Sequence, residues 1–327
     1  FFGTNPYDEA SFNDKNKEYG FELRYYKGHL NKHNVILTQN VDAVCIFVND
    51  TADAEVLHMM ADNGVKLLAL RCAGYNNVDL KAAADCGITV VRVPAYSPYA
   101  VAEYTVALML SLNRKIPRAT WRTRDGNFSL HGLLGFDMYG KTVGIIGTGK
   151  IAKKLIMILR GFGMNVLAYD LYPDYNFARE HQVVYTTLDE LYHSSDIISL
   201  HCPLTEQTKY LINDYSISKM KEGVMIINTG RGQLIHTNAL IEGLKNKKIG
   251  SAGLDVYEEE GEYFYEDQSD RIIDDDVLAR LLSFNNVIVT SHQAFFTREA
   301  LENIATTTLQ NIKDFASGKA LENEVKI

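Results

Sequence analysis

The stretch VGIIGTGKIA, residues 143–152, joins an apolar run to a glycine-rich turn and the start of a helical pattern. Gly147 permits the tight turn, Gly149 lets the backbone approach a pyrophosphate, and Ala152 keeps the helix close to the strand. The start of such a helix offers unpaired N–H groups and a positive dipole end to phosphates. About twenty residues later the apolar run NVLAYD ends in Asp170, whose carboxylate can bind a ribose and would repel a 2′-phosphate. The stretch therefore predicts a domain that binds NAD rather than NADP.

Apolar runs and helical patterns alternate from this stretch onward, which indicates a doubly wound α/β sheet. Most of the runs are continuously apolar, as expected for parallel strands that are buried on both faces. The predicted strands are 142–147, 165–170, 196–201, 223–229, 250–256 and 286–292. The predicted helices are 150–162, 187–193, 238–247 and 275–282.

A shorter α/β pattern precedes this region. It predicts strands at 43–48, 66–70 and 89–93 and helices at 54–63 and 80–86. Pro94 ends the last strand, and Ser97-Pro98 is a good start for the next helix. A long amphipathic helix after His292 ends at Gly318, and we expect it to fold back onto the N-terminal part. The expected fold is α/β, with two Rossmann-like doubly wound parallel-sheet domains. One combines 1–97 with 297–327, and 98–296 is inserted into it as the NAD-binding domain.

The composition of the chain argues against several classes of binding partner. The 327 residues carry a formal net charge of −8, which argues against nucleic acid or an anionic membrane surface as the partner. No apolar run approaches the roughly 20 residues of a membrane span, and the first residues do not resemble a signal peptide. The four cysteines, which lie far apart in the sequence, are Cys45, Cys72, Cys86 and Cys202. We therefore expect no metal site and no disulfide. The lack of disulfides favours a cytoplasmic location.

Three groups with possible chemistry follow predicted strands. In an open α/β sheet, ligands bind beyond the carboxyl ends of the strands. Arg231 lies between two glycines after a buried strand, where a guanidinium is suited to grip a carboxylate. His292 ends the last predicted strand and is the best acid/base candidate, with His201 as its nearest rival. The acidic run VYEEEGEYFYED, residues 256–267, follows another strand, and a solvated surface loop remains the alternative for most of it.

Seven segments carry a resemblance to a known family. They are RCAGYNNVDL, VPAYSPYAVAEY, YGKTVGIIGTGKIA, HCPLTEQT, MIINTGRGQLI, GLDVYEEE and SHQAFFT. Together they resemble the D-isomer-specific 2-hydroxyacid dehydrogenases, in that family's order and over nearly the whole chain. The match is best with the fermentative branch, which interconverts pyruvate and D-lactate. The resemblance implies an NAD-dependent oxidoreductase whose substrate domain is built from both chain ends.

The resemblance also implies roles for individual residues. Arg231 is expected to bind the substrate, His292 to act as acid/base, and Glu260 to pair with His292 and favour its charged form. Glu260 is singled out because the family's glutamate falls five positions after the aspartate of DV, here Asp255. His236 departs from the pattern, because relatives often have Asp after RGxLI.

Further contacts carry over from the same motifs. The amides of Ala73 and Gly74 are expected to bind the substrate's carboxylate, and Tyr96 and Phe295 to line its side-chain pocket. The expected cofactor contacts are Gly147, Gly149, Lys150, Ile151, Asp170, Cys202, Pro203, Thr208, Thr229, Gly230 and Asp255.

The sequence leaves two other functions open. One is a dehydrogenase of another D-2-hydroxy acid, with a branched-chain, aryl or hydroxypyruvate substrate. The other is a non-enzymatic NAD sensor like the C-terminal-binding-protein corepressors, against which the complete Arg, Glu and His set argues. We also expect a homodimer or higher homo-oligomer, formed through a segment such as residues 118–140.

Overall fold

The computed structural model describes residues 1–259, 263–265 and 267–326. The chain divides into two compact units, which are Phe1–Ser97 with Phe296–Ile327, and Pro98–Phe295. Phe296 thus joins the first unit, whereas the predicted boundary put it in the second. Its ring packs edge-on against Tyr7 of the same unit, with the ring centroids 4.7 Å apart.

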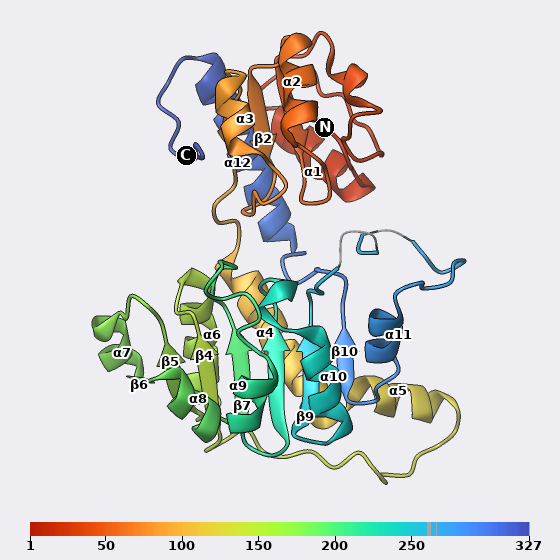
Figure 1. Cartoon of the computed structure of the whole chain (residues 1–327), viewed down its shortest axis with the longest axis vertical. Coiled ribbons are helices and arrows are strands. Elements are labelled where there is room, and N and C mark those ends of the chain that lie inside the picture. The colour runs from red at the N-terminus through yellow and green to blue at the C-terminus, as the bar shows by residue number, and fades with distance from the viewer. Residues whose placement is uncertain (260–262, 266, 327) are drawn as a thin grey trace. The chain divides into compact units, whose positions relative to one another are not determined.

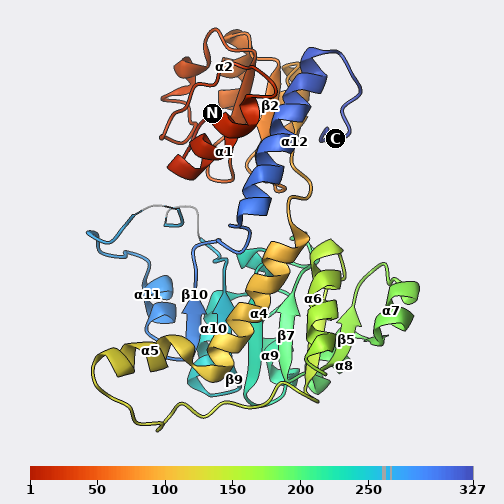
Figure 2. The same ribbon diagram turned by 180° about the vertical axis from the view of Figure 1, so that it is seen from behind.

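The first unit contains a three-stranded parallel sheet in the order β1-β2-β3. Its strands are β1 (Ala43–Ile46), β2 (Leu67–Leu70) and β3 (Thr89–Val91). Its helices are α1 (Pro6–Asn16), α2 (Ala54–Asp62), α3 (Leu80–Asp85) and α12 (Arg298–Ala316). The C-terminal helix α12 packs against α1 and β2, so both ends of the chain build this unit (Figure 2).

The second unit contains a seven-stranded sheet in the order β10-β9-β8-β7-β4-β5-β6, with every neighbouring pair parallel. Its strands are β4 (Thr142–Ile146), β5 (Asn165–Tyr169), β6 (Val183–Tyr185), β7 (Ile197–Leu200), β8 (Val224–Asn228), β9 (Ile249–Leu254) and β10 (Val287–Val289). The chain builds outward from β4 first in one direction and then from β7 in the other. This is the doubly wound arrangement that the alternating pattern predicted.

Helices cover both faces of this sheet. Figures 1 and 2 show α8, α9 and α10 on one face and α4 and α6 on the other. The bounds are α4 (Pro98–Arg114), α5 (Ile116–Arg124), α6 (Lys150–Gly161), α7 (Tyr175–His181), α8 (Leu188–Ser194), α9 (Asp214–Lys219), α10 (Thr237–Lys245) and α11 (Asp276–Leu282). Because both faces are covered by helices, ligands can reach the sheet only at the ends of its strands. No helix within the described ranges is long and apolar enough to cross a membrane.

Candidate active site

The carboxyl edge of the seven-stranded sheet gathers the predicted residues of the second unit. Because the strands are parallel, they all end at this edge. The residues that follow them are Gly147 after β4, Asp170 after β5, Cys202 after β7, Thr229 to Arg231 after β8, Asp255 after β9 and His292 after β10. The strand order reverses between β4 and β7, which is where open α/β sheets bind their ligands.

The turn after β4 is shaped for a dinucleotide. Gly147 has φ +89°, and a Cβ there would lie 2.5 Å from the backbone nitrogen of Cys202. Only glycine therefore fits this position. Gly149 precedes α6, which begins at Lys150 with Ile151 in its first turn. The bare backbone and the start of the helix leave room and N–H groups for a pyrophosphate, so the residues present fit NAD.

Asp170 is held in a defined orientation beside this turn. Its Oδ2 accepts hydrogen bonds from the Thr148 amide (2.6 Å) and hydroxyl (2.9 Å), and its Oδ1 accepts one from the Tyr172 amide (2.8 Å). Burial acts to raise the pKa of Asp170, but these hydrogen bonds outweigh it and hold the pKa below its usual value. The carboxylate is therefore charged at neutral pH, as discrimination against a 2′-phosphate requires.

A compact turn follows β7. The Thr208 hydroxyl donates to the carbonyl of Pro203 (2.7 Å), and its oxygen accepts from the amide of Thr205 (2.8 Å). These bonds close the 203–208 loop next to Cys202. The structure thus places the predicted residues Cys202, Pro203 and Thr208 together beside the Gly147 turn.

Arg231 lies on a tightly braced turn after β8. The Asn228 side chain accepts from the Gly230 amide (3.0 Å) and donates to the Arg231 carbonyl (2.9 Å). The Arg231 guanidinium donates to the carbonyl of Gly230 (2.8 Å). The Thr229 hydroxyl meets that of Thr105 on α4 at 3.0 Å. The turn is therefore fixed to the strand below it and to the helix beside it.

Asp255 organises the loop that carries His292. Its Oδ1 accepts from the Thr290 hydroxyl (2.6 Å) and the Gln293 amide (2.9 Å), and its Oδ2 from the Ala294 amide (2.8 Å). Burial raises the pKa of Asp255 above its usual value, although these hydrogen bonds favour the charged form. The cofactor contact expected of Asp255 stays a prediction.

His292 has an unusual backbone conformation. Its φ is +53°, a left-handed value that few residues other than Gly adopt, although Asn, Asp and His do so more often than the rest. Its amide donates to the Asp255 carbonyl (2.7 Å), and its carbonyl accepts from the Tyr265 hydroxyl (3.1 Å). A left-handed residue held by hydrogen bonds at a sheet's ligand edge is typical of a functional site. Glu260, the predicted partner of His292, lies outside the described residues.

The two preceding glutamates have different surroundings. Glu258 accepts hydrogen bonds from the amide (3.1 Å) and the hydroxyl (2.6 Å) of Thr237, the first residue of α10. His236, at the N-cap of α10, makes no side-chain capping bond. An N-cap side chain bonds the amide of the second or third helical residue, whereas Glu258 bonds that of the first, so it satisfies another of the unpaired amides at the start of α10. Glu259 is exposed, as expected for a surface acid.

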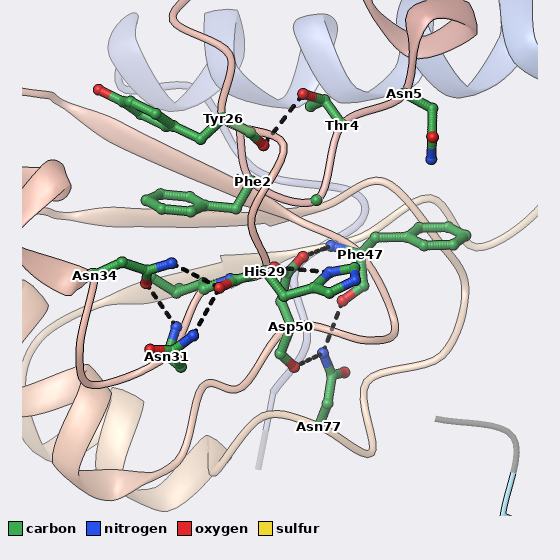
Figure 3. A network of polar contacts seen from close by, with 12 residues as sticks. Phe2, Thr4, Asn5, Tyr26, His29, Asn31, Asn34, Phe47, Asp50 and Asn77 are labelled. Atoms are coloured by element: carbon green, nitrogen blue, oxygen red, sulfur yellow. Dashed lines mark hydrogen bonds and ion pairs between the residues drawn. The ribbon is translucent and has the colours of Figure 1, made fainter. Parts of the chain in front are cut away.

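The RCAGYNN loop belongs to the first unit. Its Ala73 carbonyl accepts from the Arg92 guanidinium (2.8 Å), and its Gly74 carbonyl from the Cys72 thiol (3.2 Å). Figure 3 shows the side-chain amide of Asn77, which donates hydrogen bonds to the backbone carbonyls of Phe47 (2.9 Å) and Asp50 (2.8 Å). The loop is thus anchored at both ends.

Two further predicted residues can be placed only within their own units. Tyr96 is held in the first unit by a hydrogen bond from Asn303 to its carbonyl (2.7 Å). Phe295 ends the second unit and is 7% exposed.

Several supporting residues were not predicted from the sequence. Thr148, Asn228 and Thr290 orient Asp170, Arg231 and Asp255 respectively. Each is a small polar residue at the end of a strand, and that position was the only available signal. In the part of the chain described by the structure, no cluster of three or more His, Cys, Asp or Glu side chains could hold a metal ion.

Comparison with known proteins adds independent findings. Residues 106–294 match the family model of the D-isomer specific 2-hydroxyacid dehydrogenase, NAD binding domain. The chain is 51% identical over 324 residues to a D-lactate dehydrogenase of Escherichia coli (strain K12), a match that covers 99% of this chain and 98% of that protein.

Solved structures of similar proteins agree with these sequence matches. The structure described as the pyruvate reductase of Chlamydomonas reinhardtii is similar with a TM-score of 0.93 and 45% identity, covering 98% of this chain and 97% of that one. A D-lactate dehydrogenase from Aquifex aeolicus, complexed with NAD and lactic acid, is similar with a TM-score of 0.86 and 34% identity, covering 97% of this chain and 95% of that one.

Proposed function

The chain belongs to the D-isomer-specific 2-hydroxyacid dehydrogenases, as an NAD-dependent oxidoreductase of D-2-hydroxy acids, and we propose that it reversibly reduces pyruvate to D-lactate. The family, the α/β fold and the NAD cofactor predicted from the sequence are thereby confirmed. Pyruvate is supported by what is known of similar proteins, which include a D-lactate dehydrogenase and a pyruvate reductase.

One observation carries the proposed chemistry. The backbone hydrogen bonds of the sheet continue past the ends of β8, β9 and β10, where the Asp255 amide donates to Asn228 (2.9 Å) and the His292 amide to Asp255 (2.7 Å). The turn of Arg231 and the loop of His292 are thus both hydrogen-bonded to the backbone of one residue, Asp255. This fixes the backbone that carries the guanidinium and the imidazole at one edge of the NAD-binding unit.

These positions suit the reduction of a 2-oxo acid. NADH, when bound, supplies the hydride that reduces C2 of the substrate. Arg231 binds the substrate's carboxylate and polarises its carbonyl, and His292 donates a proton to the developing alkoxide. Glu260 pairs with the imidazole and orients it. The amides of Ala73 and Gly74 also bind the carboxylate.

The remaining predicted contacts complete the proposal. Tyr96 and Phe295 select for a small side chain. The predicted cofactor residues at the carboxyl edge hold NAD, with Gly147 and Gly149 at the pyrophosphate and Asp170 at the ribose.

A substrate panel tests this proposal directly. The oxidation of NADH is followed by absorbance with pyruvate, branched-chain and aryl 2-oxo acids and hydroxypyruvate. The reverse reaction is then run with each enantiomer of lactate. We expect the highest kcat/KM for pyruvate and a reaction with D-lactate alone. A higher kcat/KM for another acid would reassign the substrate, and no turnover with any acid would support the NAD sensor.

Replacing Asp170 should change the preference between cofactors. Asp170→Asn removes the negative charge and keeps one acceptor for Thr148, although its NH2 group then faces the Tyr172 amide in place of an acceptor. We expect the ratio of kcat/KM for NADPH to that for NADH to rise by about tenfold or more. A tenfold change corresponds to a difference of ~1.4 kcal/mol in transition-state binding. The initial rates with the two cofactors measure this ratio. Unchanged discrimination against NADPH would show that the ribose contact lies elsewhere.

We also propose that the chain forms a homo-oligomer through residues 118–140. This segment exposes large apolar side chains to an extent that a monomer seldom tolerates, with Trp121 at 67%, Leu130 at 83%, Leu134 at 87% and Tyr139 at 80% exposure. The same segment of a second copy would cover them. Sedimentation velocity measures the mass in solution, and a monomer at micromolar concentration would contradict this proposal.

A further inference from the structure

Glu258 connects two segments that border the proposed active site. The first is the run that follows β9, in which Glu258 precedes Glu260 by two positions. The second is the start of α10, where Thr237 gives Glu258 two hydrogen bonds, of 3.1 Å from its amide and 2.6 Å from its hydroxyl. Thr237 is only 5% exposed, so this contact is largely shielded from water. The carboxylate also lies at the positive end of the helix dipole, an attraction that adds to the two hydrogen bonds.

A third segment joins at the same point. Hydrogen bonding to Glu258 raises the pKa of the Tyr210 phenol, and burial and the nearby charge of Glu258 act in the same direction. The Tyr210 ring packs edge-on against His236, with the ring centroids 5.1 Å apart. The Tyr210 amide donates to the carbonyl of Gln233 (2.8 Å). Glu258 therefore sits where the loop after β7, the Arg231 turn and the acidic run meet.

The backbone transmits this anchoring to Arg231. Gly232, the next residue, lies directly against the peptide of Tyr257 and Glu258. A Cβ on Gly232 would be 2.6 Å from the amide nitrogen of Glu258 and would overlap the Tyr257 carbonyl. The turn of Arg231 thus rests on the segment that Glu258 fixes. A shift of that segment would remove one support of the turn, beside those that Asn228 and Thr105 provide.

We propose that Glu258 is a positioning residue for the reaction. Its carboxylate locks the acidic run to the start of α10 and so sets the place of Arg231 against the substrate's carboxylate. This inference rests on the proposed function, because it needs a substrate that Arg231 binds. A displacement of about 1 Å at a catalytic group can cost a factor of 10² in rate.

Kinetics of four variants test this role. Glu258→Ala should raise the KM for pyruvate and lower kcat, with a loss in kcat/KM of about tenfold or more. Glu258→Gln keeps one acceptor for Thr237 and should retain most of the wild-type kcat/KM. Thr237→Val removes the hydroxyl alone and should give a smaller loss. The double variant Glu258→Ala/Thr237→Val should be no worse than Glu258→Ala, because the two side chains act through one contact.

The controls separate positioning from folding. Glu259→Ala removes the adjacent exposed carboxylate and should match the wild type. The Kd for NADH, measured by fluorescence, should be unchanged in all variants. If Glu258→Ala lowers the melting temperature yet leaves KM and kcat at wild-type values, Glu258 only caps a helix and the inference is overturned. If Glu258→Ala does not fold, wild-type kinetics of both Glu258→Gln and Thr237→Val overturn it. A wild-type chain that reduces no 2-oxo acid would instead refute the proposed function.

Discussion

Replacing His292 by Asn should lower the kcat for pyruvate reduction by about 10²–10⁴, the usual contribution of a positioned general acid. Asn is the right substitution because the backbone at His292 has φ +53°, and Asn tolerates left-handed values better than Ala does. The amide bond to Asp255 and the carbonyl bond from Tyr265 do not involve the imidazole, so both can persist. The variant therefore removes the proton donor and leaves its loop in place.

A second histidine provides the matched control. His201 also follows a strand of the same sheet, and its Nε2 lies 2.8 Å from the Ser199 hydroxyl. Burial lowers the pKa of His201 to about 4, so this ring is neutral at pH 7 and lacks the acidic imidazolium proton that a general acid donates. His201→Asn should keep most of the kcat, and both variants should bind NADH with the wild-type Kd. Near-normal turnover by His292→Asn would remove His292 from the mechanism.

The order of parallel strands explains how much of the site could be predicted. Arg231, Asp255 and His292 are up to sixty-one positions apart in the sequence, yet each lies within three residues of the end of a strand. The rule that strand ends share one edge brings them together without any knowledge of side-chain packing. The choice of Glu260 among three glutamates could not be made in this way. It came only from the resemblance to a family.

Other features depend on packing that no local pattern encodes. Helix α7 and strand β6, at 175–185, were not predicted, because that stretch is rich in polar residues and forms the end of the sheet. The left-handed conformation of His292 arises from the hydrogen bonds made by Asp255, thirty-seven positions earlier. At the start of α10, Thr237 donates its amide to Glu258, which lies 21 positions later in the sequence. Each of these depends on contacts between segments remote in sequence.

Replacing Arg231 by Lys should lower kcat/KM for pyruvate by about 10²–10³, the range found when one donor to a transition-state oxyanion is lost. Lys keeps the positive charge but is a point donor, and it cannot hold a carboxylate through two parallel hydrogen bonds. The turn itself should survive, because Asn228 braces it through the Gly230 amide and the Arg231 carbonyl. Both KM and kcat should therefore worsen, while the Kd for NADH stays at its wild-type value.

Chemical rescue distinguishes this loss from a collapsed turn. Arg231→Ala leaves a gap between two glycines whose backbone is held by Asn228 and by the peptide of Tyr257. Added guanidinium at millimolar concentration should restore part of the pyruvate reduction by Arg231→Ala, because a planar cation can enter that gap and grip the carboxylate. It should not rescue His292→Asn, which lacks a proton donor rather than a carboxylate ligand. A wild-type kcat/KM in Arg231→Lys would show that the substrate's carboxylate is bound by other groups, and the amides of Ala73 and Gly74 would then be the first to test.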